Sequence, residues 1–379
     1  MRIGVPKETK NNEYRVGMTP SGVRELVNHG HRVLVESNAG KGVGLTDKHY
    51  SNAGAEVVMS AGEVFGQTEL IVKVKEPQHS EIGLLSPGQV LFAYLHLAPD
   101  PEQTKGLLAA DCVAIAYETV TASGGGLPLL APMSRVAGRM SIQAGATCLE
   151  KSHGGAGVLL GGVPGVAAGR VVILGGGVVG HNAAQMAVGL GADVTVIDRS
   201  LERLAYLDAF FGNRIHTIHS TAAAIEEYAF AADLVVGAVL VPGAATPKLL
   251  ARSHLASMRP GSVLVDVAID QGGCFETSRP TTHDQPTFIV EDIVHYCVAN
   301  MPGAVARTST FALTTATLPF VLALADKGYQ QALLDDTNLR MGLNIHRGEV
   351  TCLPVATATS HCDKYVEPLT SIRSKSAAG

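Results

Sequence analysis

Residues 171–180 read VVILGGGVVG, four apolar residues followed by a cluster of glycines. Within this stretch Gly175, Gly177 and Gly180 match the pattern GxGxxG. In this pattern the first glycine permits a tight turn from strand to helix, the second lets the backbone approach a pyrophosphate, and the third lets helix and strand pack closely. The stretch therefore predicts the strand, turn and helix that open a dinucleotide-binding domain.

The residues around the glycines favour NAD over NADP. The helix expected after them presents free backbone N–H groups and a positive dipole end to phosphates. The next strand pattern ends in Asp198, about 20 residues after the first glycine, where a carboxylate accepts ribose hydroxyls and repels a 2′-phosphate. Arg199 follows directly and can hold a 2′-phosphate, so NADP stays an alternative. The structural alternative is a glycine-rich turn without a ligand.

The order of apolar segments predicts an α/β fold with two doubly wound, Rossmann-like domains and a cleft between them. Short apolar strands alternate with helical patterns over the first third of the chain and again from residue 170, which is typical of parallel sheets covered on both faces. A glycine break at 122–128 separates the two series, and a helical pattern over 309–329 follows the second. We expect the last segment to return to the first domain, with segments at 1–128, 129–306 and 307–379.

The composition indicates a globular protein of the cytoplasm. Hydrophobic residues make up 46% of the 379 residues and charged residues 17%, which favours large cores over disorder. The net charge is −5 and no basic run occurs, so a nucleic-acid partner is not expected. No apolar run reaches the ~18 residues of a membrane helix. The start, MRIGVPKETK, is typical of a strand followed by charges rather than of a signal peptide.

The cysteines are scattered and contain no CxxC pair. We expect them to be reduced thiols, as is usual in the cytoplasm, and we expect no metal site. A zinc site is the alternative. The six positions are Cys112, Cys148, Cys274, Cys297, Cys352 and Cys362.

Polar residues stand at the predicted ends of several strands, where open α/β sheets bind ligands. They are Arg15, Lys75, His96 and Asp270, with Lys73 ranked lower because it lies farther from its strand end. Each of them alone could be a structural or solvated residue. As a set they suit a small acid, because arginine binds a carboxylate, lysine adds positive charge, and histidine and aspartate move protons. The set predicts hydride removal from a small amino or hydroxy acid.

These residues lie in segments that resemble NAD-dependent alanine dehydrogenases along nearly the whole chain. The amino-terminal segment also resembles the NAD(H)-binding subunit of proton-translocating transhydrogenase, which lacks the equivalents of His96 and Asp270. The matching segments are MRIGVPKETKNNEYRVGMTP, LIVKVKEP, LFAYLHLAPD, LPLLAPMSRVAGRM, VVILGGGVVGHNAA, VTVIDRS, LVDVAIDQGGCFETSRPTTHDQPTF and VANMPGAVARTSTFALT.

The resemblance implies reversible oxidative deamination of L-alanine to pyruvate and ammonium with NAD. It also implies a homohexamer in which the NAD-binding domain is inserted into the substrate domain. It assigns the substrate carboxylate and carbonyl oxygen to Arg15 and Lys75, and acid–base roles to His96 and Asp270. With Gly175 and Gly180, which come from the glycine motif, the expected cofactor positions are Ser134, Gly177, Val178, Asp198, Arg203, Ser220, Val239, Leu240, Val267, Ala268, Ile269, Arg279, Val298, Ala299, Asn300 and Met301.

Two residues depart from the family pattern. Arg135 stands where the family often has glutamate, which bears on cofactor affinity, and Thr315 stands where it often has asparagine, which bears on packing or a local hydrogen bond. Two other functions stay open: a dehydrogenase of another small amino or 2-oxo acid, and a transhydrogenase-like NAD(H) module that passes hydride to a partner protein. Which of His96 and Asp270 is the main base also stays open.

Overall fold

The computed structural model describes residues 1–239 and 246–376, and the chain divides into two compact units. The first unit comprises Met1–Met133 and Val305–Gly379, and the second comprises Ser134–Ala304. The predicted boundaries after residues 128 and 306 lie a few residues from these limits. The assignment of substrate binding and NAD binding to separate domains stays a prediction.

In the described part of the first unit, eight strands form one sheet in the order β15-β14-β6-β5-β4-β1-β2-β3. Strands β1 to β6 pair in parallel, whereas β14 and β15 add an antiparallel edge. Because β5, β4 and β1 are neighbours, the loops that follow them meet at one edge of the sheet. The bounds are β1 (Arg2–Val5), β2 (Arg32–Glu36), β3 (Glu56–Val58), β4 (Leu70–Val72), β5 (Val90–Ala93), β6 (Val113–Ala116), β14 (Leu343–His346) and β15 (Glu349–Val350).

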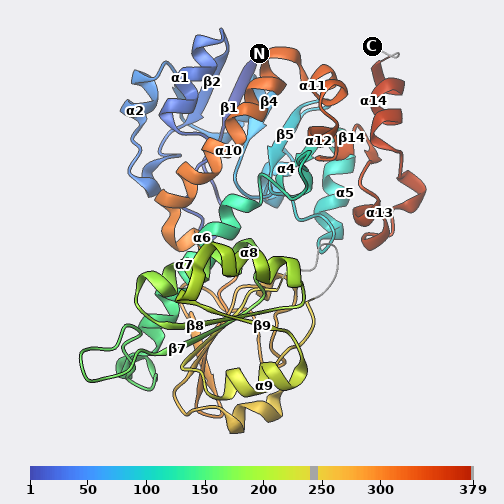
Figure 1. Ribbon diagram of the computed structural model, residues 1–379. Coiled ribbons are helices and arrows are strands. Elements are labelled where there is room, and N and C mark those ends of the chain that lie inside the picture. Colours follow the sequence, from blue (N-terminus) through green and yellow to red (C-terminus); the bar gives the residue numbers. More distant parts are fainter. Residues whose placement is uncertain (240–245, 377–379) are drawn as a thin grey trace. The chain divides into compact units, whose positions relative to one another are not determined.

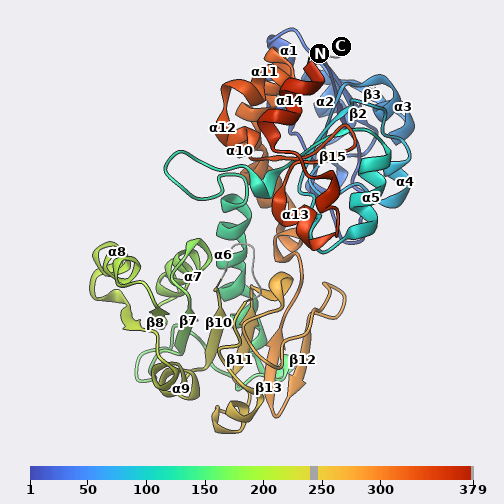
Figure 2. The same cartoon turned by 90° about the vertical axis from the view of Figure 1, so that its right-hand side faces the viewer.

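Helices cover both faces of this sheet, with α3, α4 and α5 on one side and α1, α10 and α11 on the other (Figure 2). Two of them begin with a capping side chain followed by proline: Thr19 accepts the N–H of Gly22, and Asp100 accepts the N–H of Gln103. The bounds are α1 (Pro20–Asn28), α2 (Asp47–Asn52), α3 (Ala61–Gln67), α4 (His79–Ile82), α5 (Pro101–Ala109), α10 (Ala306–Lys327), α11 (Tyr329–Asp335), α12 (Thr337–Arg340), α13 (Leu353–Ala358) and α14 (Pro368–Ser376).

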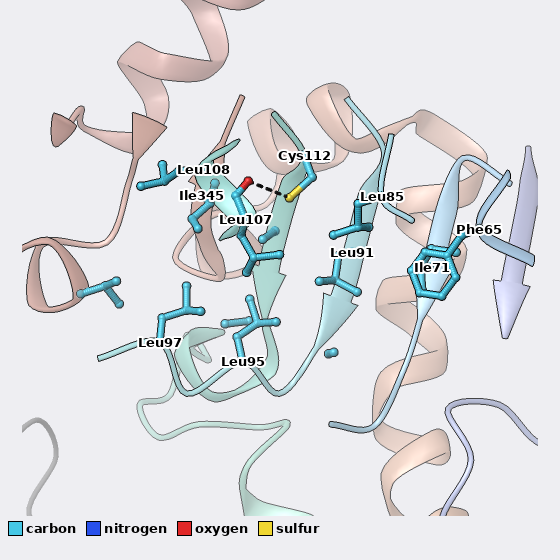
Figure 3. Packing of buried hydrophobic residues seen from close by; sticks show 14 of the residues in the cluster. Phe65, Ile71, Leu85, Leu91, Leu95, Leu97, Leu107, Leu108, Cys112 and Ile345 are labelled. Carbon is cyan, nitrogen blue, oxygen red and sulfur yellow. Dashed lines mark hydrogen bonds between the residues drawn. The ribbon is translucent and has the colours of Figure 1, made fainter. Parts of the chain in front are cut away.

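One hydrophobic cluster of the first unit packs helices α3 and α5 against a face of this sheet (Figure 3). Phe65 and Leu107 come from helices, and Ile71 and Leu91 come from neighbouring strands; all four are at most 1% exposed. Burial of such side chains contributes roughly 1.5–3 kcal/mol each, so this layer holds the sheet rigid beneath the loops at its edge.

The described strands of the second unit form a sheet in the order β12-β13-β11-β10-β7-β8-β9; Figure 2 labels β12, β13, β11, β10, β7 and β8, and Figure 1 labels β9. The chain moves outward from β7 to β9 and then returns to the other side of β7 with β10. This reversal is the switch point at which open α/β sheets bind nucleotides. The bounds are β7 (Arg170–Leu174), β8 (Asp193–Asp198), β9 (His216–His219), β10 (Leu234–Gly237), β11 (Val263–Asp266), β12 (Thr287–Val290), β13 (Ile293–Tyr296), α7 (Val178–Gly189), α8 (Leu201–Phe211) and α9 (Ala222–Phe230). Helix α6 (Ala131–Cys148) includes the boundary between the units.

The predicted α/β class with two Rossmann-like, mostly parallel sheets is confirmed. Four strands escaped prediction: β9, β13, β14 and the two-residue strand β15. The segments HTIH, IVHY and LNIH each contain histidine or asparagine and are only four residues long. Their apolar pattern is therefore too short to predict a strand. The strands that precede Lys75, His96 and Asp270 also end earlier than predicted, at Val72, Ala93 and Asp266.

One helix bears on the expectation that no apolar run reaches the length of a membrane helix. Residues Met301–Lys327 are long and apolar enough to cross a membrane by length and composition alone, and 44% of the most apolar window is buried in the protein. Serine and threonine interrupt the apolar run in the sequence, but the mean hydropathy of the segment stays high enough for a membrane helix. Within the first unit, Leu313, Val321 and Leu324 of α10 are at most 1% exposed, as in a core helix.

Candidate functional site

The glycine motif forms the turn between β7 and α7, and its glycines have different steric surroundings. Gly175 has φ +101°, and a Cβ there would lie 2.8 Å from the carbonyl oxygen of Ala238. A Cβ on Gly180 would collide with the carbonyl oxygen of Gly175. A Cβ on Gly177 would meet no atom within 4 Å. The fold therefore requires the first and third glycines, whereas the second leaves open space of the kind that a pyrophosphate needs.

Asp198 and Arg203 hold the turn from the side of β8. Asp198 Oδ2 accepts the N–H of Gly176 at 2.6 Å, and its Oδ1 accepts the N–H of Ser200 at 2.8 Å. Arg203 donates Nε–H to the carbonyl of Gly176, and its guanidinium lies 4.5 Å from the Tyr206 ring centroid. The two oxygens of the Asp198 carboxylate thus fix the turn by accepting one backbone N–H each, and each oxygen can accept a further hydrogen bond. Arg199 is exposed.

Most other predicted cofactor positions follow the carboxyl ends of strands in this sheet. Ser220 follows β9, Val239 follows β10, and Arg279 stacks 4.4 Å from the Phe288 ring centroid. Ser134 lies on α6, and Leu240 lies outside the described residues. Those that follow β11 or β13 are Val267, Ala268, Ile269, Val298, Ala299, Asn300 and Met301. Since β7, β10, β11 and β13 are consecutive in the sheet, these loops share one edge.

Asp270 lies in the loop after β11, within the short helix η6 (Ile269–Gln271). It is exposed, and two glycines with positive φ follow it: Gly272 at +90° and Gly273 at +79°. The loop therefore folds back on itself immediately after the aspartate.

Arg15 is buried in the first unit and clamped by a glutamate that sequence analysis did not single out. Nε and Nη2 of Arg15 each donate to a carboxylate oxygen of Glu13 at 2.6 Å, and Nη1 lies 3.1 Å from Met133 Sδ. Burial opposes the charged guanidinium, but the hydrogen bonds and charge of Glu13 outweigh it and raise the pKa of Arg15. Glu13 thus accepts from both Nε and Nη2 and fixes the orientation of the guanidinium.

Lys73 and Lys75 have different surroundings although they lie two residues apart. Lys73 is 0% exposed, and its Nζ lies 2.7 Å from Glu81 Oε1 and 3.3 Å from Glu8 Oε2. Lys75 is half-buried. Burial opposes the charged form of Glu76, but Lys75 and the neighbouring Lys10 outweigh it and lower the pKa of Glu76. Lys73 is thus a structural ion-pair partner, which agrees with its lower rank.

The backbone brings Lys75 beside the segment that carries His96. The N–H of Lys73 donates to the carbonyl of Phe92 at 3.1 Å, and the N–H of Tyr94 donates to the carbonyl of Val74 at 3.1 Å. The pairing of β4 with β5 therefore continues beyond both strands.

The Arg15 segment lies against the same edge. A Cβ on Gly17 would collide with the carbonyl of Val72, and the phenol of Tyr94 and the carboxylate of Glu8 lie close enough to Arg15 to affect its pKa. The structure thus brings Arg15, Lys75 and the segment of His96 to one edge of the first sheet.

His96 has a left-handed backbone with φ +49°, which is uncommon for a residue other than glycine. Its side chain is 45% exposed, and its ring stacks on that of Tyr94 with centroids 5.9 Å apart and planes at 7°. Tyr94 is fixed in turn, because its hydroxyl donates to the carbonyl of Leu129 at 2.6 Å. Glu118 Oε1 accepts the N–H of His96 at 2.6 Å and lies 4.0 Å from His96 Nδ1.

Several residues that hold the predicted ones were not predicted from the sequence: Glu13, Glu118, Tyr94 and Met133. Only Glu13 carried a signal, since it stands two residues before an arginine in a polar loop. Glu118 lies 22 residues from His96 and has no local pattern.

The two departures from the family pattern are both exposed on helices. Arg135 lies on α6. Thr315 lies on α10 and donates its hydroxyl to the carbonyl of Phe311 at 2.8 Å, so its effect is a local hydrogen bond. All six cysteines are unpaired. Over residues 1–239 and 246–376, no group of three His, Cys, Asp or Glu side chains is placed to hold a metal ion.

Comparisons with known proteins cover both units. Residues 4–137 match the family described as alanine dehydrogenase/PNT, N-terminal domain, and residues 141–353 match alanine dehydrogenase/PNT, C-terminal domain. The chain belongs to this family. The alanine dehydrogenase of Halomonas elongata is 62% identical over 94% of this chain and 96% of its own length. That of Mycolicibacterium smegmatis is 55% identical over the same shares of the two chains.

Solved structures agree with this assignment. One titled L-alanine dehydrogenase has a TM-score of 0.92 and 53% identity, and covers 95% of this chain and 99% of its own. A transhydrogenase from Sinorhizobium meliloti has a TM-score of 0.80 over 93% of this chain, and at 24% identity it shows the fold alone. The predicted membership of the alanine dehydrogenase family, and with it the enzyme class, is confirmed.

Proposed function

We propose that this protein is an NAD-dependent L-alanine dehydrogenase that converts L-alanine, water and NAD⁺ reversibly to pyruvate, ammonium, NADH and a proton. The observation that carries the proposal is the cluster at one edge of the first sheet, where Arg15, Lys75 and the His96 segment converge. A guanidinium, an ammonium and an imidazole suit a small 2-amino acid with a free carboxylate. Relatives at more than half identity carry the name alanine dehydrogenase.

The second unit fits a dinucleotide. Gly177 leaves open space at the amino terminus of α7, whose free N–H groups and dipole suit a pyrophosphate. Asp198 at the end of β8 suits the ribose hydroxyls of NAD. When bound, NAD supplies the hydride acceptor. We therefore assign NAD binding to the second unit and substrate binding to the first.

The roles of the residues follow from their chemistry. Arg15 would bind the substrate carboxylate through its guanidinium, which Glu13 orients. Lys75 would donate to the carbonyl oxygen of pyruvate, and His96 would exchange a proton with the amine or carbonyl oxygen. Asp270 would take a proton from the water that adds to the imine carbon. Carbon–nitrogen cleavage then releases ammonium, with the proton returned to the nitrogen.

The family resemblance leads us to propose a homohexamer in the cytoplasm, without nucleic-acid or membrane partners. Light scattering of the purified protein measures the assembly directly. A monomer would contradict the hexamer without bearing on the reaction.

The test of the function is NADH formation from NAD with L-alanine, beside L-serine, glycine, D-alanine and NADP. The chain contains no tryptophan, so NADH binding can also be followed by its fluorescence without interference. Rapid reduction with L-alanine and NAD alone is the expected result. Reduction with another amino acid would change the substrate, and NADH binding without any reaction would favour a transhydrogenase-like module.

A further inference from the structure

The loop that carries Asp270 is built around a buried carboxylate, Asp266, at the last position of β11. Asp266 is 0% exposed, and its oxygens accept the N–H groups of Ala268 at 3.1 Å, Cys274 at 2.8 Å and Phe275 at 3.4 Å. The hydroxyl of Ser278 donates to Oδ2 at 2.5 Å. One side chain thus gathers amides from both ends of the loop.

Lys248 satisfies the backbone carbonyl groups of the same loop. Its ammonium donates to the carbonyls of Gly272, Gly273 and Phe275, at 3.0 Å and 3.2 Å for the last two. An ammonium has three N–H donors, and here each has a carbonyl of the loop within reach. Phe275 is therefore held at its N–H by Asp266 and at its carbonyl by Lys248.

The backbone around Lys248 adds two further connections. The N–H of Thr246 donates to the carbonyl of Gln271 at 3.1 Å, and the N–H of Leu249 donates to the carbonyl of Cys274 at 2.7 Å. The segment 246–250 thus runs along the loop as a partner strand would, and it places Lys248 over the glycine pair.

The position of Asp270 depends on the hydrogen bonds that Asp266 and Lys248 make to this loop. Its side chain is exposed and makes no hydrogen bond to any described residue. The turn after it closes through the N–H of Gly272 to Ile269, at 3.0 Å. A Cβ on Gly273 would lie 2.6 Å from Asp266 Oδ2, so the buried carboxylate also requires the glycine that turns the loop.

We propose that Asp266 and Lys248 are positioning residues for Asp270, one gathering the amides of its loop and the other the carbonyls. The inference rests on the proposed function, in which Asp270 moves protons. Neither residue touches the reacting atoms; both act by fixing the backbone from which the Asp270 carboxylate projects.

The first test replaces Lys248 by methionine, which keeps the unbranched side chain and removes all three donors. The matched control is Lys151→Met, because Lys151 is exposed in the same unit and its side chain makes no hydrogen bond to a described residue. We expect kcat for L-alanine oxidation to fall about tenfold in K248M, because a small misplacement of a catalytic group is costly. The KM for L-alanine in K248M and all constants of K151M should stay within about twofold. An unchanged kcat in K248M would overturn the proposal.

A double-mutant cycle separates positioning from general structural damage. If Lys248 acts through Asp270, then K248M should cost little further activity in a D270N background. If the two losses multiply, Lys248 acts elsewhere and the proposal fails. If D270N alone keeps wild-type turnover, Asp270 moves no proton. That result would reject both the proposed role of Asp270 and the positioning role of Asp266 and Lys248.

Amide hydrogen exchange gives a readout that needs no activity. We expect the amides of Ala268, Cys274 and Phe275 to exchange faster in K248M than in K151M, while those of α7 are unchanged. Equal exchange in the two variants would overturn the proposal. If the wild-type protein fails to oxidise L-alanine, the proposed function falls on that assay alone, and exchange still decides whether Lys248 holds the loop.

Discussion

Glu118 accepts the backbone N–H of His96 at 2.6 Å and faces the imidazole Nδ1 of the same residue at 4.0 Å. The same carboxylate accepts the N–H of Leu95 at 3.2 Å. A left-handed backbone costs a residue other than glycine roughly 1 kcal/mol or more, and it persists only where its surroundings determine it. Glu118 supplies that constraint, so the orientation of His96 depends on a residue of the next strand connection.

Replacing Glu118 should impair turnover more than substrate binding. We expect Glu118→Gln to lower kcat about tenfold, because the amide replaces one accepting oxygen by a donor, and we expect Glu118→Ala to lower it further. The measurement is the pH profile of kcat and of kcat/KM. Glu102, an exposed residue of α5, supplies the control, and Glu102→Gln should match the wild type. Wild-type profiles in E118Q would remove Glu118 from the site.

Substituting Arg15 should act on the substrate and leave the cofactor alone. Arg15→Lys keeps the charge but loses the paired bonds to Glu13, whose side chain is 0% exposed. We expect the KM for L-alanine to rise 10-fold or more, on the order of one charged hydrogen bond, and the protein to lose about 3 kcal/mol of stability. The Kd for NADH should be unchanged, because its predicted ligands lie in the other unit. An unaltered KM would contradict the carboxylate role.

The motif glycines offer a matched pair of substitutions. Gly180→Ala should destabilise the second unit by about 1–3 kcal/mol, because its Cβ would collide with the carbonyl of Gly175. Gly177→Ala should leave the unfolding free energy unchanged, since nothing lies within 4 Å of its Cβ, and should weaken NADH binding 10-fold or more. Denaturant unfolding and NADH fluorescence titration measure the two effects. Tight NADH binding by G177A would place the pyrophosphate elsewhere.

His295 should make stability depend on pH near neutrality. Burial lowers the pKa of His295 from 6.5, and Nδ1 must donate to the carbonyl of Ile293, while Nε2 accepts from Thr277. The unfolded chain therefore binds more protons, and the free energy of unfolding falls as the pH drops below 6.5, by at most about 1.4 kcal/mol per pH unit.

His295→Asn keeps a donor for the Ile293 carbonyl and cannot be protonated in this range. Urea unfolding at several pH values should show that its stability is flatter than that of the wild type from about pH 7 to about pH 5. Equal slopes for the two proteins would show that His295 does not carry this dependence.

Much of the site was predictable because its signals are local. The spacing of Gly175, Gly177 and Gly180 follows from the geometry of one turn, and Asp198 ends the next strand. Arg15, Lys75, His96 and Asp270 follow strands of parallel sheets, where ligand sites collect, although the strands end three or four residues earlier than the apolar runs suggest. Their roles stay predictions.

The sequence by itself determined the α/β class, the glycine turn and the candidate polar residues, because periodicity, turn geometry and residue chemistry are properties of short segments. Tertiary structure alone decided that Lys73 is buried in ion pairs with Glu8 and Glu81, whereas Lys75 is only half-buried. It likewise placed Glu118 beneath His96 and surrounded Asp266 with the amides of its loop. These arrangements depend on which strands become neighbours and on which charges are removed from water. Neither is encoded in any single stretch of the chain.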